Sequence, residues 1–359
     1  MRFSFFRFCS IATLLFAGSG GCGSNTATLP TTDTGGETAT VPVNAGWCTA
    51  AGLLGCNGFD VCGVCVPAPS GEAVRTADTK EYKGTGPVDV SCFETGAVAP
   101  AGTSQKVKIK GFVKIFANGP DSKNVKIDVY EEILDDKGLP TGKIGPTPIA
   151  TGSSDAAFGT LEDKITKKGV ETIRVLYGYE VDGVPTEKPL VIKTSGKTAD
   201  DGWFELYDYN QAVRNDAVKA GVYDGLNVRA LGNDDYASIL KAAYSRPPEG
   251  GQSAIAGEVH DCGDVRISNA TVEISPKSSL GLFYLSEVED DPLPKSSLSS
   301  TARLGLYAVG GLTPGIYSVS SLAKVGGVTK TLGNYRVQTF PNAVSVYTFR
   351  GLRPWQIKK

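Results

Sequence analysis

The amino-acid sequence predicts an all-β protein in which two β-sandwiches stand in tandem, preceded by a small disulfide-rich cap. Three observations lead to this fold class. The 359 residues include 44 Gly and 20 Pro but one Met, which is typical of a turn-rich β protein. Apolar and polar residues alternate with a period of two in segments that recur later in the chain. Most of the cysteines are concentrated in the region that precedes these segments.

The N-terminus has the layout of a signal peptide over residues 1–21. Arg2 and Arg7 form a basic start, and Phe8 to Ala17 is a mainly apolar run that is too short to span a bilayer of about 30 Å as a permanent helix. Cys22 follows directly after small residues. The segment resembles a bacterial lipoprotein signal, in which this cysteine is diacylated and becomes the new N-terminus. The alternative is an ordinary secreted protein in which Cys22 has no special role.

Residues 22–46 are predicted to form a flexible tether, since they are rich in Thr, Gly and Pro and contain no Lys or Arg. Gly23 stands where the lipoprotein pattern would have Asp for retention in the inner membrane. The resemblance therefore implies a lipid-anchored protein of the outer membrane or cell surface. A lipid-modified Cys22 followed by a tether is an arrangement suited to displaying a folded domain.

The cysteines that remain after these assignments are predicted to form disulfides. An even number in an exported chain favours a disulfide framework, because the compartment is oxidising. Six cysteines allow 15 pairings, and the sequence does not choose among them. Most of them fall in the predicted cap, residues 47–100, and the last could tie that cap to the second sandwich. The six are Cys48, Cys56, Cys62, Cys65, Cys92 and Cys262.

The cap cysteines also allow two other interpretations, a zinc site and a redox motif. Cys48, Cys56, Cys62 and Cys65 could supply four zinc ligands, but their spacing lacks the paired CxxC motifs of typical zinc sites. The Cys62–Cys65 CxxC is followed by a Pro-rich segment rather than a helix, which disfavours a thioredoxin-like role.

An internal repeat accounts for most of the remaining chain. Residues 109–113 (IKGFV) correspond to residues 255–259 (IAGEV). Each of these two segments is followed by a further segment of alternating apolar and polar residues. Residues 177–185 align with 304–314, which pairs Tyr179 with Tyr307. The repeat predicts two modules of the same β fold.

The second copy carries a more specific pattern in residues 305–317, GLYAVGGLTPGIY. Pro314-Gly315 predicts a tight turn between two strands. This segment resembles the signature of carboxypeptidase-regulatory-like domains, which implies seven-stranded Greek-key sandwiches of the prealbumin (transthyretin-like) kind. The chain as a whole resembles lipoproteins of myxobacteria and their relatives. That resemblance implies a fold and a location but no reaction.

The first sandwich is predicted to span residues 101–248, and the carboxypeptidase-regulatory-like sandwich residues 249–359. Apolar residues among charges in 210–222 predict a short helical insertion, and 238–245 predicts a second short helix. Residues 245–251 (SRPPEGG) are predicted to form a hinge between the domains.

Few residues in the sequence point to a catalytic site. His260 is the only histidine, and it lies two residues from Cys262, which raises the idea of a Cys/His nucleophile. We expect instead a disulfide-bonded Cys262 and a partly buried His260. Five acidic clusters could bind Ca²⁺ through their oxygens, although such turns are usually solvated: 131–132, 135–136, 200–201, 234–235 and 287–291.

Four aromatic residues could stack on sugars, although large aromatics in strands usually belong to the core: Trp203, Tyr207, Tyr209 and Trp355. The formal net charge of −2 gives no reason to expect a nucleic-acid partner. The sequence therefore predicts a non-enzymatic, lipid-anchored envelope protein, without a cofactor or metal, that binds an envelope protein or polysaccharide or has a structural role. The alternatives are a carbohydrate-binding surface protein and a hydrolase that uses acidic residues.

Overall fold

A computed structural model describes residues 56–76, 86–95 and 102–350, apart from 118, 137 and 168. The chain divides into residues 1–38 and 39–359, and every described residue belongs to the second unit. The predicted signal peptide, the whole of the predicted tether with Cys22, and also Cys48 and Trp355 lie outside the described residues. None of the described helices is long and apolar enough to cross a membrane.

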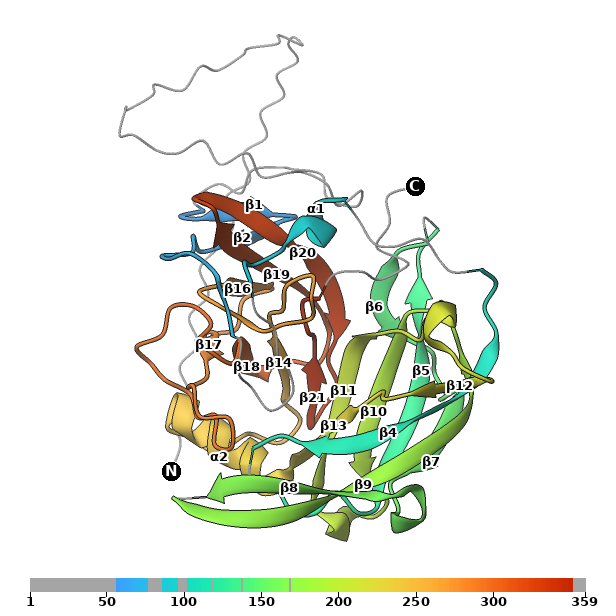
Figure 1. Cartoon of the computed structure of the whole chain (residues 1–359). Helices are drawn as coiled ribbons and strands as arrows, with labels where there is room; N and C mark the ends of the chain where they lie inside the picture. The colour runs from blue at the N-terminus through green and yellow to red at the C-terminus, as the bar shows by residue number, and fades with distance from the viewer. Residues whose placement is uncertain are drawn as a thin grey trace, which may run out of the picture. The chain divides into compact units, whose positions relative to one another are not determined.

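The described chain is mainly β, with several sheets (Figure 1). The N-terminal elements are β1 (Phe59–Val61), β2 (Val64–Val66), β3 (Val74–Arg75) and α1 (Ser91–Thr95). The strands of the first repeat are β4 (Lys106–Ile115), β5 (Val125–Leu134), β6 (Pro140–Ile144), β7 (Ala150–Ser153), β8 (Thr160–Lys167), β9 (Val170–Pro185), β10 (Leu190–Gly196), β11 (Trp203–Gln211), β12 (Val222–Asp224) and β13 (Val228–Gly232). The strands of the second repeat are β14 (Ser253–Glu258), β15 (Ile267–Ser268), β16 (Thr271–Ser275), β17 (Phe283–Tyr284), β18 (Leu306–Leu312), β19 (Ile316–Val325), β20 (Val328–Gln338) and β21 (Ala343–Val346). The helical segments between them are α2 (Asn233–Tyr244) and the 3₁₀ turns η1 (Ala156–Phe158), η2 (Ala199–Asp201) and η3 (Asn215–Ala217).

The repeat seen in the sequence has a counterpart in the strand pairing. In the first repeat β5, β10 and β11 pair in that order, and in the second repeat β16, β19 and β20 do the same. The other sheet of each repeat also matches. β4 pairs antiparallel with β9 and parallel with β12 and β13, whereas β14 pairs antiparallel with β18 and parallel with β21. The two repeats thus share one pairing scheme.

A glycine and a tyrosine occupy equivalent positions in the two repeats. Gly111 pairs with Tyr179, and Gly257 pairs with Tyr307. The Tyr179 hydroxyl donates a hydrogen bond of 2.5 Å to the carbonyl of Leu226, and the Tyr307 hydroxyl donates one of 2.6 Å to the carbonyl of Tyr347.

Each glycine leaves room for the carbonyl that accepts this hydrogen bond. A Cβ at Gly111 would lie 2.3 Å from the Leu226 oxygen, and a Cβ at Gly257 would lie 1.9 Å from the Tyr347 oxygen. The paired sequence positions therefore form the same buried unit, in which a side chain larger than glycine has no space.

The two repeats are joined through one continuous sheet and one shared core. Residues 205–208 of β11 pair in parallel with residues 343–346 of β21, and Figure 1 shows these strands side by side. Tyr209 from the first repeat is buried in the same apolar cluster as Val319 from the second. The predicted boundary between residues 248 and 249 falls between α2 and β14, and the sheet continues across it.

The predicted helical insertion differs from the observed structure. Over residues 210–222 the chain leaves β11, buries Val213 completely and enters β12, and its only helical element is the 3₁₀ turn η3. Positive φ angles at Ala220 and Gly221 are incompatible with a continuing right-handed helix. The second predicted helix is α2, which begins at Asn233 rather than near 238, with Asp234 and Asp235 favourably placed in its first turn.

The described part of the cap packs on the second repeat. Val61, Val64 and Val66 of the β1–β2 hairpin form an apolar cluster with Leu322 of β19. The Asn334 amide of β20 donates a hydrogen bond of 3.4 Å to the carbonyl of Val61. Farther along, β3 pairs with β15. The hairpin therefore covers a face of the sheet formed by β16, β19 and β20.

Candidate functional site

Two disulfides are formed between described cysteines. Cys56 is bonded to Cys65, with the two Cα atoms 5.6 Å apart, and Cys92 is bonded to Cys262, with the two Cα atoms 5.7 Å apart. Cys62 is also disulfide-bonded. Since Cys65 is bonded to Cys56, the two cysteines of the CxxC motif are not bonded to each other. These five cysteines have no free thiol to offer zinc, a redox partner or a substrate.

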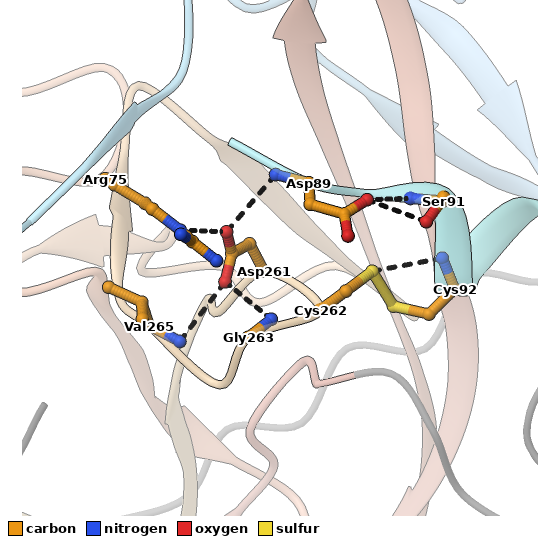
Figure 2. The surroundings of a disulfide bond; sticks show 8 residues. All are labelled: Arg75, Asp89, Ser91, Cys92, Asp261, Cys262, Gly263 and Val265. Atoms are coloured by element: carbon orange, nitrogen blue, oxygen red, sulfur yellow. Dashed lines mark hydrogen bonds and ion pairs between the residues drawn. A yellow bond between two sulfur atoms is a disulfide. The ribbon is translucent and has the colours of Figure 1, made fainter. Parts of the chain in front are cut away.

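The Cys92–Cys262 disulfide lies beside a buried carboxylate, as Figure 2 shows. Asp261 is fully buried and accepts a hydrogen bond of 2.5 Å from Nε of Arg75. It also accepts hydrogen bonds from the backbone N–H groups of Asp89, Gly263 and Val265 at 2.9–3.3 Å. The side chain of Asp261 therefore ties two separate pieces of the cap to the turn that follows β14.

Backbone hydrogen bonds around the disulfide also attach the cap to the turn that follows β14. The Cys262 N–H donates to the carbonyl of Asp89 at 2.8 Å, and the Cys92 N–H donates to Sγ of Cys262 at 3.0 Å. The carboxylate of Asp89 accepts hydrogen bonds from the hydroxyl and the N–H of Ser91, which lower the pKa of Asp89. The cap is thus bound to the second repeat by covalent, ionic and backbone contacts in one place.

A second group of charges lies at the junction of the two repeats, and its centre is Glu258. Oε1 of Glu258 lies 3.1 Å from Nη2 of Arg229 and 3.0 Å from Nη2 of Arg266. Oε2 of Glu258 lies 2.6 Å from Nε2 of His260. Arg229 also contacts Asp208 at 3.3 Å. Because Arg229 lies on β13 and Glu258 ends β14, these ion pairs connect the first repeat to the second.

Burial would by itself raise the pKa of Glu258, but Arg229, Arg266 and the hydrogen bond with His260 oppose this effect. Together they hold the pKa of Glu258 well below its ordinary value. The carboxylate is therefore ionised at neutral pH and serves as a counter-charge for the buried Arg266 and the half-buried Arg229.

His260 is fully buried between two carboxylates. Nε2 of His260 faces Glu258, and Nδ1 lies 2.8 Å from Oδ1 of Asp264. Both ring nitrogens are therefore engaged, and Cys262 is consumed in a disulfide. The Cys/His nucleophile weighed from the sequence is not formed. The burial of His260 is more complete than the sequence led us to expect.

Four carboxylates line one cavity beside this network, which is the arrangement that a hydrolase of acidic residues would need. Glu258 is paired as described above, Asp163 lies 2.7 Å from Arg174, and Glu289 lies 3.6 Å from Arg266. Asp290 accepts a hydrogen bond of 2.8 Å from the N–H of Thr166. Each carboxylate of this cavity thus has an ion-pair or hydrogen-bond partner.

The remaining candidates from the sequence are dispersed in the structure. Trp203, Tyr207 and Tyr209 are 7%, 6% and 0% exposed, so they are core residues rather than a surface on which sugars could stack. No three His, Cys, Asp or Glu residues lie close enough to hold a metal ion within the part of the chain that the structure describes.

The network around Glu258 was not anticipated from the sequence. A sequence signal does exist, because Glu258 and Arg266 are charged residues within otherwise apolar strand segments. Nothing in the sequence indicates, however, that Arg229 from the other repeat meets them.

Replacing Glu258 with Gln is expected to lower the free energy of unfolding by about 3 kcal/mol at pH 7, because Arg229 and Arg266 both lose a buried anionic partner. A depressed pKa stabilises the fold above the unfolded value near 4.5, so the loss relative to the parent should shrink as the pH falls below that value. Urea unfolding at several pH values measures both effects.

The matched control for this prediction is Glu249→Gln, since Glu249 forms an exposed ion pair with Arg246 at 2.9 Å. It should change the free energy of unfolding by less than about 1 kcal/mol. A Glu258→Gln variant as stable as this control would contradict the role assigned to Glu258.

Comparison with known proteins does not place the chain in a family. No family model matches the sequence, and no curated protein matches it significantly. Among solved structures, the Bacillus anthracis TIE protein is similar over 68% of this chain, with 12% identity and a TM-score of 0.18, and the match spans 33% of that protein. A streptococcal ancillary pilin is similar over 69% of both chains, with 10% identity and a TM-score of 0.18. The pilus backbone protein of Streptococcus pneumoniae is similar over 68% of this chain and 100% of its own, with 7% identity and a TM-score of 0.18. Likenesses this low establish neither a shared fold family nor a shared function.

Proposed function

We propose that the chain is a non-enzymatic protein of the cell envelope, held at the outer membrane or cell surface by lipid on Cys22. Its two repeats, taken as prealbumin-like Greek-key sandwiches, would serve as a rigid structural or binding module. The observation that carries the proposal is the closed junction between the repeats. There, β11 pairs with β21, Tyr209 shares a core with the second repeat, and Arg229 pairs with Glu258.

This junction supports a structural role because bending it would be costly. Relative motion of the repeats would break backbone hydrogen bonds, expose apolar surface and separate buried charges. A hinged enzyme usually keeps such an interface small and polar. A spacer or a display module is better served by a large, apolar interface that keeps the repeats rigid.

The attachment of the cap supports the same proposal. If Cys22 is lipidated, any pull between the membrane and the folded part passes through the cap. The disulfide between Cys92 and Cys262, together with the Arg75–Asp261 ion pair, would transmit that pull to the second repeat. An anchored envelope protein has a use for a covalent bond at this position.

Replacing Cys22 with Ser is expected to move the protein from the membrane fraction to the soluble fraction, because the lipid-modified thiol would be lost. Fractionation of cells that express each form, followed by immunoblotting, measures this change. Cys9→Ser is the matched control, since Cys9 lies in the predicted signal peptide and should leave the protein in the membrane fraction. A Cys22→Ser variant that stays in the membrane fraction would refute the anchor.

The partner is proposed to be an envelope protein or a polysaccharide. Cross-linking in intact cells followed by affinity purification would identify a protein partner, whereas a glycan array tests the polysaccharide. Turnover of a glycan or peptide by the purified chain would contradict the non-enzymatic assignment.

A further inference from the structure

An apolar cavity lies between α2 and the sheet at the junction of the two repeats. The sheet forms its floor, which includes Ala256 of β14 and the residue that pairs with it, Ala308 of β18. Tyr236 and Leu240 of α2 form part of the opposite wall.

The cavity is suited to an apolar group. Its volume of about 70 Å³ is several times the roughly 10–15 Å³ needed to hold one water. Nearly all of its lining atoms are apolar, so water inside would find few hydrogen-bond partners. A short chain or a ring would instead gain contacts with side chains that face empty space.

This apolar cavity borders a charged one. Arg229 and Glu258 line the apolar cavity together with Phe116 and Leu306, and the same residues also line the neighbouring charged cavity. The two cavities are therefore adjacent and meet at the ion pair between the repeats. A ligand that fills both would need an apolar part and a polar head.

The charge of that head follows from the residues of the charged cavity. The carboxylates there have the cation or N–H partners described above, and Arg174, Arg229 and Arg266 are paired with them. Lys114 is partly buried and also lines the cavity. Its side chain has no hydrogen bond or ion pair with any residue that the structure describes. An anionic head could pair with Lys114 without breaking an existing contact.

We propose that the two cavities form one binding site for an anionic amphiphile, with its apolar chain beneath α2 and its carboxylate beside Lys114. The class of ligand is a short or medium-chain carboxylate. This assignment does not depend on the lipid anchor or on the rigid-module proposal, because it rests only on the lining of the cavities.

Titration calorimetry with octanoate tests the site. The full chain carrying Cys22→Ser is suitable, because it needs no detergent that would compete with the probe. We expect one octanoate to bind per chain and octanol to bind at least fivefold more weakly. Absence of saturable octanoate binding, or equal affinity for octanol, would overturn the proposal.

Two variants separate the apolar and the anionic parts of the site. Ala256→Leu fills the cavity floor and should abolish binding of both probes, while Ala308→Val is the smaller substitution to use if the first does not fold. Lys114→Gln should weaken octanoate binding at least fivefold and leave octanol binding unchanged.

Lys143→Gln is the matched control, since Lys143 is exposed on β6 and does not line either cavity. Folding of each variant is checked by its urea unfolding midpoint. Octanoate binding that survives in a folded Ala256→Leu variant, or that is lost equally in Lys143→Gln, would overturn the assignment.

Discussion

Replacing Glu132 with Gln is expected to make the protein more stable above neutral pH and to remove a large part of its pH dependence. Burial raises the pKa of Glu132 to about 8, and the hydrogen bond from the N–H of Gly142, 2.9 Å long, only partly opposes this effect. Glu132 therefore carries a proton in the folded protein at pH 7, whereas in the unfolded chain it is ionised.

The sign of the effect follows from this difference. Because the folded pKa lies above the ordinary value of 4.5, the unfolded chain releases the proton between pH 4.5 and 8 while the folded chain keeps it. The contribution of Glu132 to the free energy of unfolding then falls by about 1.4 kcal/mol per pH unit over this range and levels off above pH 8. Glutamine does not titrate and avoids this loss. The free energy of unfolding of Glu132→Gln should therefore equal that of the parent near pH 4.5 and exceed it by up to about 5 kcal/mol above pH 8.

Urea unfolding of the parent and the variant between pH 4.5 and 9, with the disulfides intact, measures this gain. Glu131→Gln is the matched control, since Glu131 is the neighbouring residue on β5 and is less buried. A difference between parent and Glu132→Gln that does not change with pH would mean that Glu132 is not a buried, protonated carboxyl.

Glu132 lies close to residues of both repeats. Glu132 pairs with Ile144 of β6, and Gly142 of the same strand packs against the backbone of Arg336 on β20. The carboxyl also influences the pKa of Tyr209 in the first repeat and of Tyr347 in the second. Its ionisation therefore acts at the junction between the repeats rather than inside one of them.

Removing the Cys92–Cys262 disulfide is expected to be the most destabilising cysteine change among the described residues. The bond joins residues that are 170 positions apart, so it restricts a very long loop in the unfolded chain. In the chain-entropy account, closing a loop of this length contributes about 5 kcal/mol. The double variant Cys92→Ser/Cys262→Ser should lose most of this amount in urea unfolding.

The Cys56–Cys65 disulfide provides the comparison, because its cysteines are only 9 positions apart. The double variant Cys56→Ser/Cys65→Ser should lose about 3 kcal/mol by the same account. An equal or smaller loss on removing Cys92–Cys262 would show that the Arg75–Asp261 ion pair and the β3–β15 pairing hold the cap without the disulfide.

Much of the local architecture could be predicted from sequence patterns. Alternating apolar residues mark β4 and β14 because one face of each strand is buried. The repeated Gly and Tyr positions were visible in the alignment of the two copies, and in the structure they form the same buried unit. The helix predicted over 210–222 failed because Val213, an apolar residue among charges, is buried against the sheet core rather than along a helix face.

The candidate site was less predictable. His260 and Cys262 stood out in the sequence because they are rare residue types close together, yet neither has a free reactive group in the structure. The arginine partners of Glu258 lie on different strands, and arginine is too common on protein surfaces for its position to signal burial.

The β character of the chain, its two copies and the likeness between them can be predicted from the sequence, since these depend on residue type and short-range periodicity. The pairing of Cys65 with Cys56 and of Cys262 with Cys92 depends on the folded arrangement of the chain, because bonding requires the two Cα atoms to lie within about 7 Å, whatever their separation in sequence. The parallel pairing of β11 with β21 was decided in the same way, since no turn in the sequence connects these strands. That pairing places Arg229 beside Glu258 and makes the two repeats one continuous structure.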